Sequence, residues 1–589
     1  MELRDSRRLP GPNFMWGRPS AIVEVNFGKA EIDLVAVMSK VWQSQARRIL
    51  DALGWMGEKT IVRELGIPLE SRTDECAISI GFALSAPLDA LYAATSIAEY
   101  ALDTAVAELT GQPLIGPAFD TVCERIATEI ADEANPQLLA LRAEALVRGA
   151  CFLSDDEHAS IGMGDGSITW PVTAIPEPRE VAWSEVHNIP HVVVTGTNGK
   201  STTVRLLSSI VTCAGLVPGI CSTDWVRVGD DIVDAGDWSG PGGARLVLRD
   251  KRVTFGLLET ARGGLMRRGL ALEEADLCAI LNISEDHLSE WGTPDMESLT
   301  DAKFIVTRVA KRVVLNADDE QLVRGAARNL TDRQEVIWFS LDPLNEVIIE
   351  HLSAGGRAVV LDGELIQLRG SWAGIDEKAS FKIASVVDVP MTVGGAARYN
   401  VANALAAVAV AADSGVALAA ITEGLHAFRT DAESNPGRLN EFNFDGIRVL
   451  VDFAHNPAGM KAFFELGNRL DAKRRLITIG QAGDRDERST REMLRVAWDA
   501  KPDLLIIKEL LLHLRGRELG ALPAIMESEL RDLGAPDERW CHAPSEMDAI
   551  RMALEWARPG DLLLLLVHDN RDETLQLLAS REAASKSPA

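Results

Sequence analysis

The stretch HVVVTGTNGKSTTVRLLSSIVTCAG, residues 191–215, decides the fold at the centre of this chain. It begins with an apolar run typical of a buried parallel strand. A glycine-containing turn with Lys200 and Ser201 follows, and then a helix with apolar residues at Val204, Leu207 and Ile210. Backbone N–H groups of such a turn, together with the helix N-terminus, bind polyphosphate oxygens. The stretch therefore predicts an α/β domain with a phosphate loop.

The residue types in the loop indicate how a nucleotide would be held. Lys200 would neutralise the β- and γ-phosphates, and the Ser201 hydroxyl, helped by Thr202, would hold magnesium. The alternative, a chance glycine-containing turn, is disfavoured by the complete strand, loop and helix context. Only two residues separate Gly196 from Gly199, whereas the usual Walker A pattern has four between its glycines.

Working outward, the chain divides into three predicted domains, at residues 1–165, 185–430 and 431–580. Short apolar runs alternate with helical patterns from residue 181, and a second such series starts near Ile447, as in doubly wound parallel sheets. The first 150 residues contain long Ala/Leu/Glu-rich helical patterns instead. We expect an α/β protein: a phosphate-loop domain and a smaller Rossmann-like C-terminal domain, preceded by an α+β domain. The Gly- and Pro-rich residues 162–180 should separate the first domain from the rest.

Composition excludes several classes of protein. The formal net charge of −27 opposes binding to nucleic acid, which depends on Lys and Arg. We expect no membrane-spanning segment, because no run of eighteen apolar residues is free of charge. The N-terminus does not have the pattern of an export signal, so we expect a cytoplasmic protein. The seven cysteines include no CxxC pair, and neither a disulfide framework nor a zinc ribbon is indicated.

The loop spacing GTNGKS resembles that of the Mur ligases and folylpolyglutamate synthetases. Other segments match the same family in order. They are LLETARGG, NISEDHL, TDAKF and NADD in the central part, and RYNVANALAA, NPGR, DFAHNP and GDRD further on. Each short motif is weak alone, but their order over about 300 residues makes coincidence implausible.

The resemblance implies that the protein binds ATP and Mg²⁺, and it implies which residues form the site. Glu259 and His287 match the family's magnesium ligands, with Ser201 as a third, and Lys303 matches a lysine that many members carbamylate. Lys200, Glu259, His287 and Lys303 are thus the implied catalytic residues. The implied nucleotide-binding residues are Gly196, Thr197, Asn198, Gly199, Lys200, Ser201, Thr202, Asn400, Arg438 and Asp452. The alternatives are ordinary: a solvated loop histidine at 287, a solvated helix lysine at 303 and a core-helix asparagine at 400.

Within this family the chain resembles the cyanophycin synthetase branch, through GDWSGPGGARLVL, LETARGGLMRRGL, NISEDHL and KELLLHLRGRELG. The N-terminal LPGPNFMWGRPS resembles the opening of that branch more loosely. Two departures stand out. No segment is long enough for the ATP-grasp domain of that branch, and Ser96 to Tyr100 lack the histidines of a metallopeptidase-like site found in some relatives. We expect no hydrolytic site there.

The resemblance implies an ATP-dependent amide ligase that forms an acyl-phosphate. A cationic amino acid such as arginine, joined to an aspartate side chain, is the leading expectation. The acceptor would be a short peptide, a polymer end or a small molecule, and the family implies a homo-oligomer, a dimer or a tetramer. Two alternatives stay open: a ligase acting on a small molecule, as in folylpolyglutamate synthetase, and an ATP-binding regulatory or scaffold protein.

Overall fold

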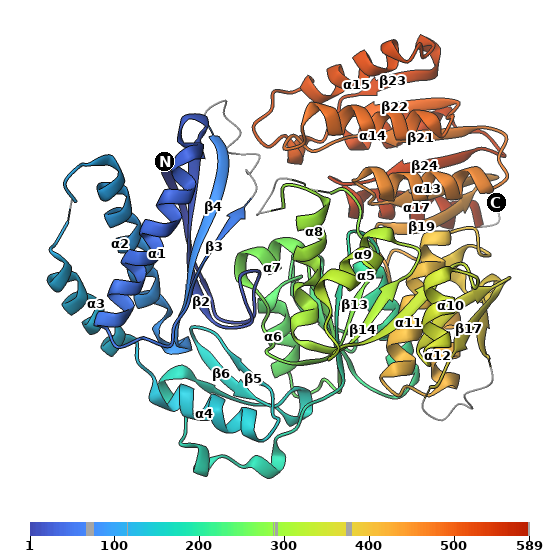
Figure 1. The fold of residues 1–589 in the computed structure, drawn as a ribbon. Helices are drawn as coiled ribbons and strands as arrows, with labels where there is room; N and C mark the ends of the chain where they lie inside the picture. Colours follow the sequence, from blue (N-terminus) through green and yellow to red (C-terminus); the bar gives the residue numbers. More distant parts are fainter. Residues whose placement is uncertain (66–75, 115, 287, 289–292, 373–379, 587–589) are drawn as a thin grey trace.

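A computed structural model describes residues 1–589 except 66–75, 115, 287, 289–292, 373–379 and 587–589. Its strands form four sheets that follow one another along the chain (Figure 1). Among the described residues, no helix is both long and apolar enough to span a bilayer.

The N-terminal part contains an antiparallel sheet in the order β1-β2-β4-β3. Its strands are β1 (Glu2–Leu9), β2 (Ser20–Gly28), β3 (Thr60–Leu65) and β4 (Cys76–Ser85). Alternate residues of β2 point to opposite faces, so Val23 and Val25 pack under the helices while Ile22 faces the central part. The helices are α1 (Val35–Ala52), α2 (Leu91–Thr110) and α3 (Phe119–Glu133). An α+β fold is confirmed.

A small unit connects this part to the centre. It consists of α4 (Pro136–Val147) and the antiparallel strands β5 (Phe152–Ser154), β6 (His158–Ile161) and β7 (Ile168–Pro171). Part of the Gly- and Pro-rich segment expected only to separate domains is therefore a strand. Position 162 has to be a glycine, because a Cβ there would lie 2.2 Å from the Gly166 carbonyl oxygen.

The central part is built on an eleven-stranded sheet in the order β11-β10-β9-β12-β8-β13-β14-β15-β16-β17-β18. The strands are β8 (His191–Thr195), β9 (Pro218–Cys221), β10 (Trp225–Val228), β11 (Asp231–Ala235), β12 (Phe255–Glu259), β13 (Ala275–Ile280), β14 (Ala310–Asn316), β15 (Glu335–Ser340), β16 (Arg357–Asp362), β17 (Leu365–Arg369) and β18 (Phe381–Ser385). Strands β9 to β16 of this order pair in parallel. The carboxyl ends of β8, β12 and β13 therefore meet at one edge.

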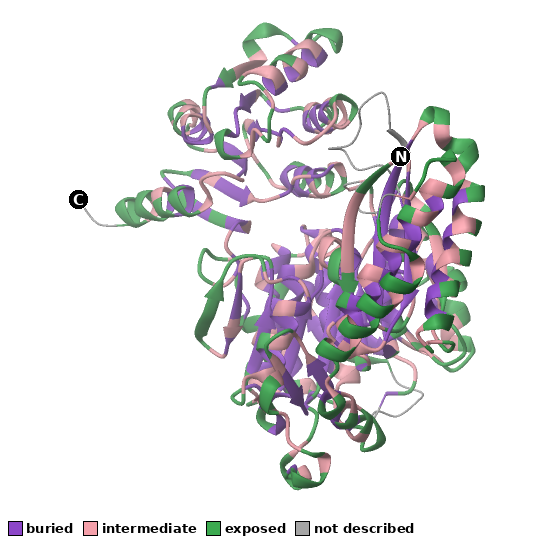
Figure 2. Cartoon of the chain, turned by 90° about the vertical axis from the view of Figure 1, so that its left-hand side faces the viewer, coloured by how far each residue is buried: buried purple, intermediate pink, exposed green. Residues whose placement is uncertain are grey.

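Helices cover both faces of this sheet (Figure 1). One core contains α5 (Lys200–Cys213), α11 (Arg398–Asp413) and α12 (Leu418–Ala427). The opposite core contains α6 (Pro241–Arg249), α7 (Arg262–Arg268), α8 (Met296–Lys303), α9 (Glu320–Asn329) and α10 (Glu346–Ser353), together with residues of the N-terminal sheet. Figure 2 shows the consequence: the inner strands of the central sheet are buried, whereas the edge strand β11 and the outer faces of the helices are exposed.

The C-terminal part contains a six-stranded sheet in the order β19-β20-β24-β21-β22-β23. The strands are β19 (Arg438–Phe444), β20 (Ile447–Asp452), β21 (Arg475–Ile479), β22 (Leu504–Lys508), β23 (Trp540–Ala543) and β24 (Leu562–Leu566), and only β19 is antiparallel to its neighbour. The helices are α13 (Pro457–Arg469), α14 (Glu487–Asp499) and α15 (Ala521–Asp532) on one face, and α16 (Glu546–Trp556) and α17 (Arg571–Lys586) on the other. The expected doubly wound α/β architecture is confirmed.

Candidate active site

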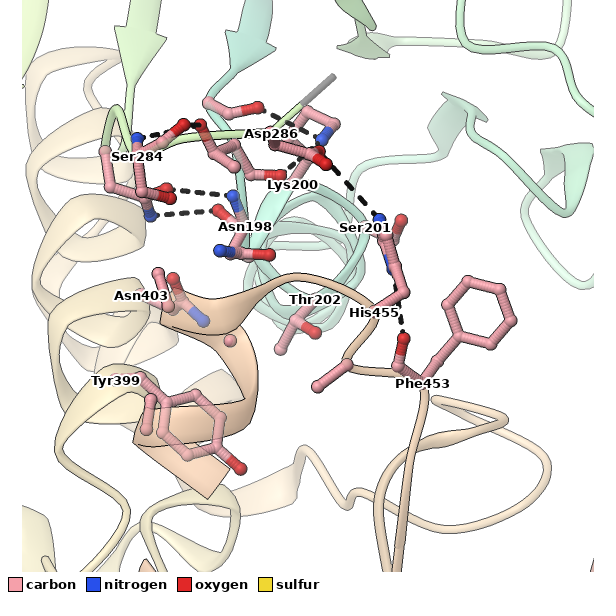
Figure 3. Close-up of a pocket in the computed structure, with 18 of the residues that line it drawn as sticks. Asn198, Lys200, Ser201, Thr202, Ser284, Asp286, Tyr399, Asn403, Phe453 and His455 are labelled. Carbon is pink, nitrogen blue, oxygen red and sulfur yellow. Dashed lines mark hydrogen bonds and ion pairs between the residues drawn. The ribbon is translucent and has the colours of Figure 1, made fainter. Parts of the chain in front are cut away.

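The turn between β8 and α5 has a backbone that requires glycine. Gly196 has φ of 151° and Gly199 has φ of 85°, values that L side chains rarely adopt. A Cβ on Gly199 would also lie 2.3 Å from Oδ1 of Asn403 on α11. The loop therefore packs directly against α11, as Figure 3 shows for the region around Asn403.

The segment after β13 holds the turn in place. The Asn198 N–H donates to Asn282 Oδ1 at 2.8 Å, and Asn282 Nδ2 donates back to the Asn198 carbonyl at 3.0 Å. The Ser284 N–H donates to Thr197 Oγ1 at 3.1 Å. The Lys200 side chain folds back over the turn, and its Nζ donates to the carbonyls of Gly196 and Thr197, at 3.1 and 3.0 Å (Figure 3). The lysine charge thus lies where a phosphate loop would receive an anion.

Three oxygen-bearing side chains form a row beside the loop. Ser201 Oγ lies 3.1 Å from Thr223 Oγ1, which donates to Glu259 Oε1 at 3.1 Å. Glu259 ends β12, and the residue is 1% exposed. Its second oxygen, Oε2, is buried and has no hydrogen-bond partner among the described residues. A buried carboxylate oxygen left without a donor is an energetically costly arrangement that a hard cation would relieve.

Lys303, at the end of α8, is 4% exposed and lines the same cavity. Burial, and secondarily the positive charge of Lys200, holds the pKa of its amine well below the usual 10.5. The solvated-lysine alternative is therefore wrong for this position. The structure thus places a buried lysine here, whose surroundings favour the neutral amine more than water does.

The C-terminal part supplies the opposite wall. Asp452 ends β20 and accepts hydrogen bonds from the backbone N–H groups of Leu439, at 2.9 Å, and Ala454, at 2.8 Å. Burial raises the pKa of Asp452 to about 6 despite these bonds. Arg438 NH1 lies 3.0 Å from Asp224 Oδ2 of the central part. Asp452 and Arg438 both line the cavity that contains the phosphate loop.

Direct contacts join the two walls. The side-chain amides of Asn198 and Asn456 exchange two hydrogen bonds, at 3.1 and 3.0 Å, although 258 residues separate them in the chain. Arg485 NH2 lies 3.0 Å from Asp286 Oδ1. Asn456 is the N-cap residue of α13, so the phosphate loop is coupled to the start of a C-terminal helix.

One cavity of about 560 Å³ gathers most of the residues that the sequence singled out. The predicted residues that line it are Gly196, Thr197, Asn198, Gly199, Lys200, Ser201, Thr202, Glu259, Lys303, Asn400, Arg438 and Asp452. Their individual roles remain predictions, and His287 lies outside the described residues. Sequence reasoning missed several polar residues of the cavity wall: Thr223, Arg262, Asn282, Asp286 and Tyr399. Four of them lie inside quoted motifs to which no residue role was given: Arg262 in LLETARGG, Asn282 and Asp286 in NISEDHL, and Tyr399 in RYNVANALAA. The lone Thr223 gave no signal.

Two protein-family models match the segments that form the two walls of the cavity. A model of the Mur ligase middle domain matches residues 194–411, and a model of the Mur ligase glutamate ligase domain matches residues 437–566. The chain therefore contains the middle and C-terminal domains of the Mur ligase family. These two domains contribute the phosphate loop and the wall with Arg438 and Asp452, respectively.

The curated relatives of this chain include cyanophycin synthetases and a 2,6-diaminopimelate ligase. The cyanophycin synthetase of Trichormus variabilis is 34% identical over 400 residues, which are 67% of this chain and 42% of that protein. The UDP-N-acetylmuramoyl-L-alanyl-D-glutamate–2,6-diaminopimelate ligase of Geobacter metallireducens is 28% identical over 402 residues, 65% of this chain and 74% of that one. A solved structure of E. coli FolC in complex with DHPP and ADP is 19% identical, with a TM-score of 0.46, covering 67% of this chain and 89% of that one. The chain thus spans less than half the length of the cyanophycin synthetase.

Proposed function

We propose that this protein is an ATP-dependent amide ligase, which activates an acceptor carboxylate as an acyl-phosphate and joins it to the amine of an amino acid. The observation that carries the proposal is the single cavity into which a phosphate loop, a buried carboxylate and a low-pKa lysine converge from one domain. Arg438 and Asp452 face them from the next domain.

In the first step, the N–H groups of the loop and Lys200 hold the β- and γ-phosphates. An oxygen of the acceptor carboxylate attacks the γ-phosphorus, a new O–P bond forms, and the bond to the ADP oxygen breaks. The cationic side chains offset the charge on the transferred group. In the second step, the amine of the incoming amino acid attacks the acyl carbon, the C–O bond breaks, and phosphate leaves with that oxygen. The amine proton is lost as the amide forms.

The residues beside the loop fit a magnesium ion. Ser201, Thr223 and Glu259 offer hard oxygen donors, and the unsatisfied Glu259 Oε2 is available to a cation. Mg²⁺ in phosphate sites is typically bound by one or two carboxylates plus substrate phosphates. Bound there, the ion would neutralise phosphate charge.

Lys303 fits the carbamylation that the family resemblance implies. An amine must be neutral to react with carbon dioxide, and burial favours the neutral amine at this position. Reaction of the neutral amine with carbon dioxide would release a proton and place an anion next to the Lys200 ammonium, whose charge lowers the pKa of the free amine.

For the substrates, we propose a cationic amino acid, such as arginine, and an aspartate side chain as the acceptor carboxylate. The cyanophycin synthetase motifs in the chain support this choice, as does the 34% identity to one such enzyme. Two competing functions are ligation onto a small-molecule acceptor and an ATP-binding regulatory role without ligation, and the test distinguishes both from the proposal.

The test measures products rather than ATP consumption alone. The protein is incubated with ATP, Mg²⁺, pools of amino acids and aspartate-containing peptides whose carboxylates carry ¹⁸O. A ligase transfers one ¹⁸O to the released phosphate and forms an amide detectable by mass spectrometry. Lys200→Ala should abolish both, whereas Lys311→Ala, which alters a largely exposed lysine, should abolish neither. Phosphate release without ¹⁸O transfer or amide under every pair would refute the ligase assignment.

A further inference from the structure

Tyr399 is a polar residue of the cavity that the mechanism above does not use. It lies in the first turn of α11, and its ring packs against the core of the C-terminal domain. Its hydroxyl is buried, and among the described residues no group forms a hydrogen bond with it. A buried hydroxyl without a partner is unfavourable by itself, so this position calls for a ligand group. Tyr399 lines the cavity that contains the phosphate loop.

The position of Tyr399 along α11 indicates which part of a nucleotide it would meet. Asn403, four residues later on the same helix face, approaches the phosphate loop at Gly199. Four residues of helix, a rise of about 6 Å, therefore separate Tyr399 along α11 from a residue that touches the loop. That spacing suits the sugar, which is joined directly to the phosphates, better than the more distant base. Figure 3 shows both side chains extending from this helix.

The neighbouring carboxylate offers the complementary group. Asp452 lines the same cavity as Tyr399. Burial, and secondarily the charge of Asp452, raises the pKa of the Tyr399 phenol well above the usual 10.0, which favours its protonated form. Each Asp452 oxygen accepts one backbone N–H and has a further lone pair. Asn400, by contrast, donates to the Met391 carbonyl at 2.9 Å and accepts from Asn403 at 3.2 Å. Tyr399 thus has an uncommitted hydrogen-bonding group on this turn.

We propose that the Tyr399 hydroxyl binds a ribose hydroxyl of the nucleotide, beside Asp452, and makes the site selective for ribonucleotides. The inference rests on the proposed use of ATP. It makes Tyr399 a specificity-determining residue, whose hydroxyl is satisfied only when the sugar is bound. The carboxylate accepts hydrogen bonds from the sugar, and the phenol supplies a donor, so together they match a vicinal diol.

The experiment is a double-mutant cycle measured by calorimetric binding. Wild type and Tyr399→Phe are titrated with ATP, 2′-deoxy-ATP and 3′-deoxy-ATP in the presence of Mg²⁺. Wild type should bind one deoxy nucleotide about five- to tenfold more weakly than ATP, because one hydrogen bond is lost. Tyr399→Phe should weaken ATP by the same factor and weaken that deoxy nucleotide no further. Tyr92→Phe, at a half-exposed tyrosine, is the matched control and should bind all three nucleotides as wild type does.

Equal weakening of ATP and both deoxy nucleotides in Tyr399→Phe would overturn the proposal, as would no change at all. Inosine triphosphate separates base from sugar: its penalty relative to ATP should be the same in wild type and Tyr399→Phe. Phenylalanine preserves the packing of the ring, and unchanged thermal unfolding of the variant checks this. If wild type bound no nucleotide, the proposed ligase function itself would fail, which this design distinguishes from failure of the Tyr399 assignment alone.

Discussion

Replacing Gly199 by alanine should break the phosphate loop while leaving the rest of the fold intact. Two costs combine at this position. The backbone has φ of 85°, a left-handed conformation that costs an L residue about 1–2 kcal/mol. The new methyl would lie 2.3 Å from Asn403 Oδ1 and 2.9 Å from its Cγ, and Asn403 is 5% exposed. Overpacking of a buried site typically costs about 1–3 kcal/mol.

We therefore expect a total penalty of about 3 kcal/mol, which corresponds to a loss of about 100-fold or more in ATP affinity. Calorimetric titration with ATP and Mg²⁺ measures it. Gly263→Ala is the matched control, because Gly263 lines the same cavity, has no positive φ, and a Cβ there meets nothing within 4 Å. Its affinity should stay within about threefold of wild type, given that surface-like substitutions cost about 0.5 kcal/mol or less.

A second substitution separates the two costs. In Gly199→Ala combined with Asn403→Ala, the collision is gone and only the backbone strain remains. The change at Asn403 should therefore be less harmful in the Gly199→Ala background than in wild type. If Gly199→Ala bound ATP as tightly as wild type, or if both glycine variants were equally weak, the steric reasoning would be refuted.

Three further predictions concern charge. Glu259→Gln should raise the Mg²⁺ concentration needed for half-maximal activity at least tenfold while ATP binding without metal changes little; an unchanged Mg²⁺ titration would count against the metal site. Asp224, ion-paired with Arg438 and Arg571, has its pKa lowered to about 2 from 3.8. Asp224→Asn should therefore lower the free energy of unfolding by about 2 kcal/mol above pH 4, and this difference from wild type should shrink as the pH falls toward 2. Urea unfolding across this range would show a difference that does not change with pH if the reasoning were wrong. Activity of carbon dioxide-depleted protein should rise on adding bicarbonate, and Lys303→Arg should abolish that response.

Local sequence predicted much of the central fold and half of the cavity. Strand β8, the glycine turn and α5 are contiguous, and their conformations depend on backbone sterics and apolar periodicity that neighbouring residues set. Glu259 was expected near the loop because LLETARGG resembles the family segment that carries a magnesium-binding glutamate. The division at residues 165, 185 and 430 remains a prediction, as do oligomeric state and compartment.

Contacts between distant segments could not be predicted in this way. The amide pair of Asn198 and Asn456 spans 258 residues, and Thr223 meets Glu259 because β9 lies next to β12 in the sheet. Neither segment carries a local pattern that specifies its partner, because each contact is fixed by strand order and domain placement.

The sequence by itself determined that a phosphate loop follows a buried strand, that a glutamate ends another strand, and that the family motifs continue into a second domain. The tertiary structure decided which side chains have shifted pKa values and which buried polar groups lack a hydrogen-bond partner. Lys303 has a low pKa, and the Tyr399 hydroxyl lacks a partner, because desolvation and hydrogen bonding depend on everything that surrounds a group. A residue's own position in the chain does not contain that information.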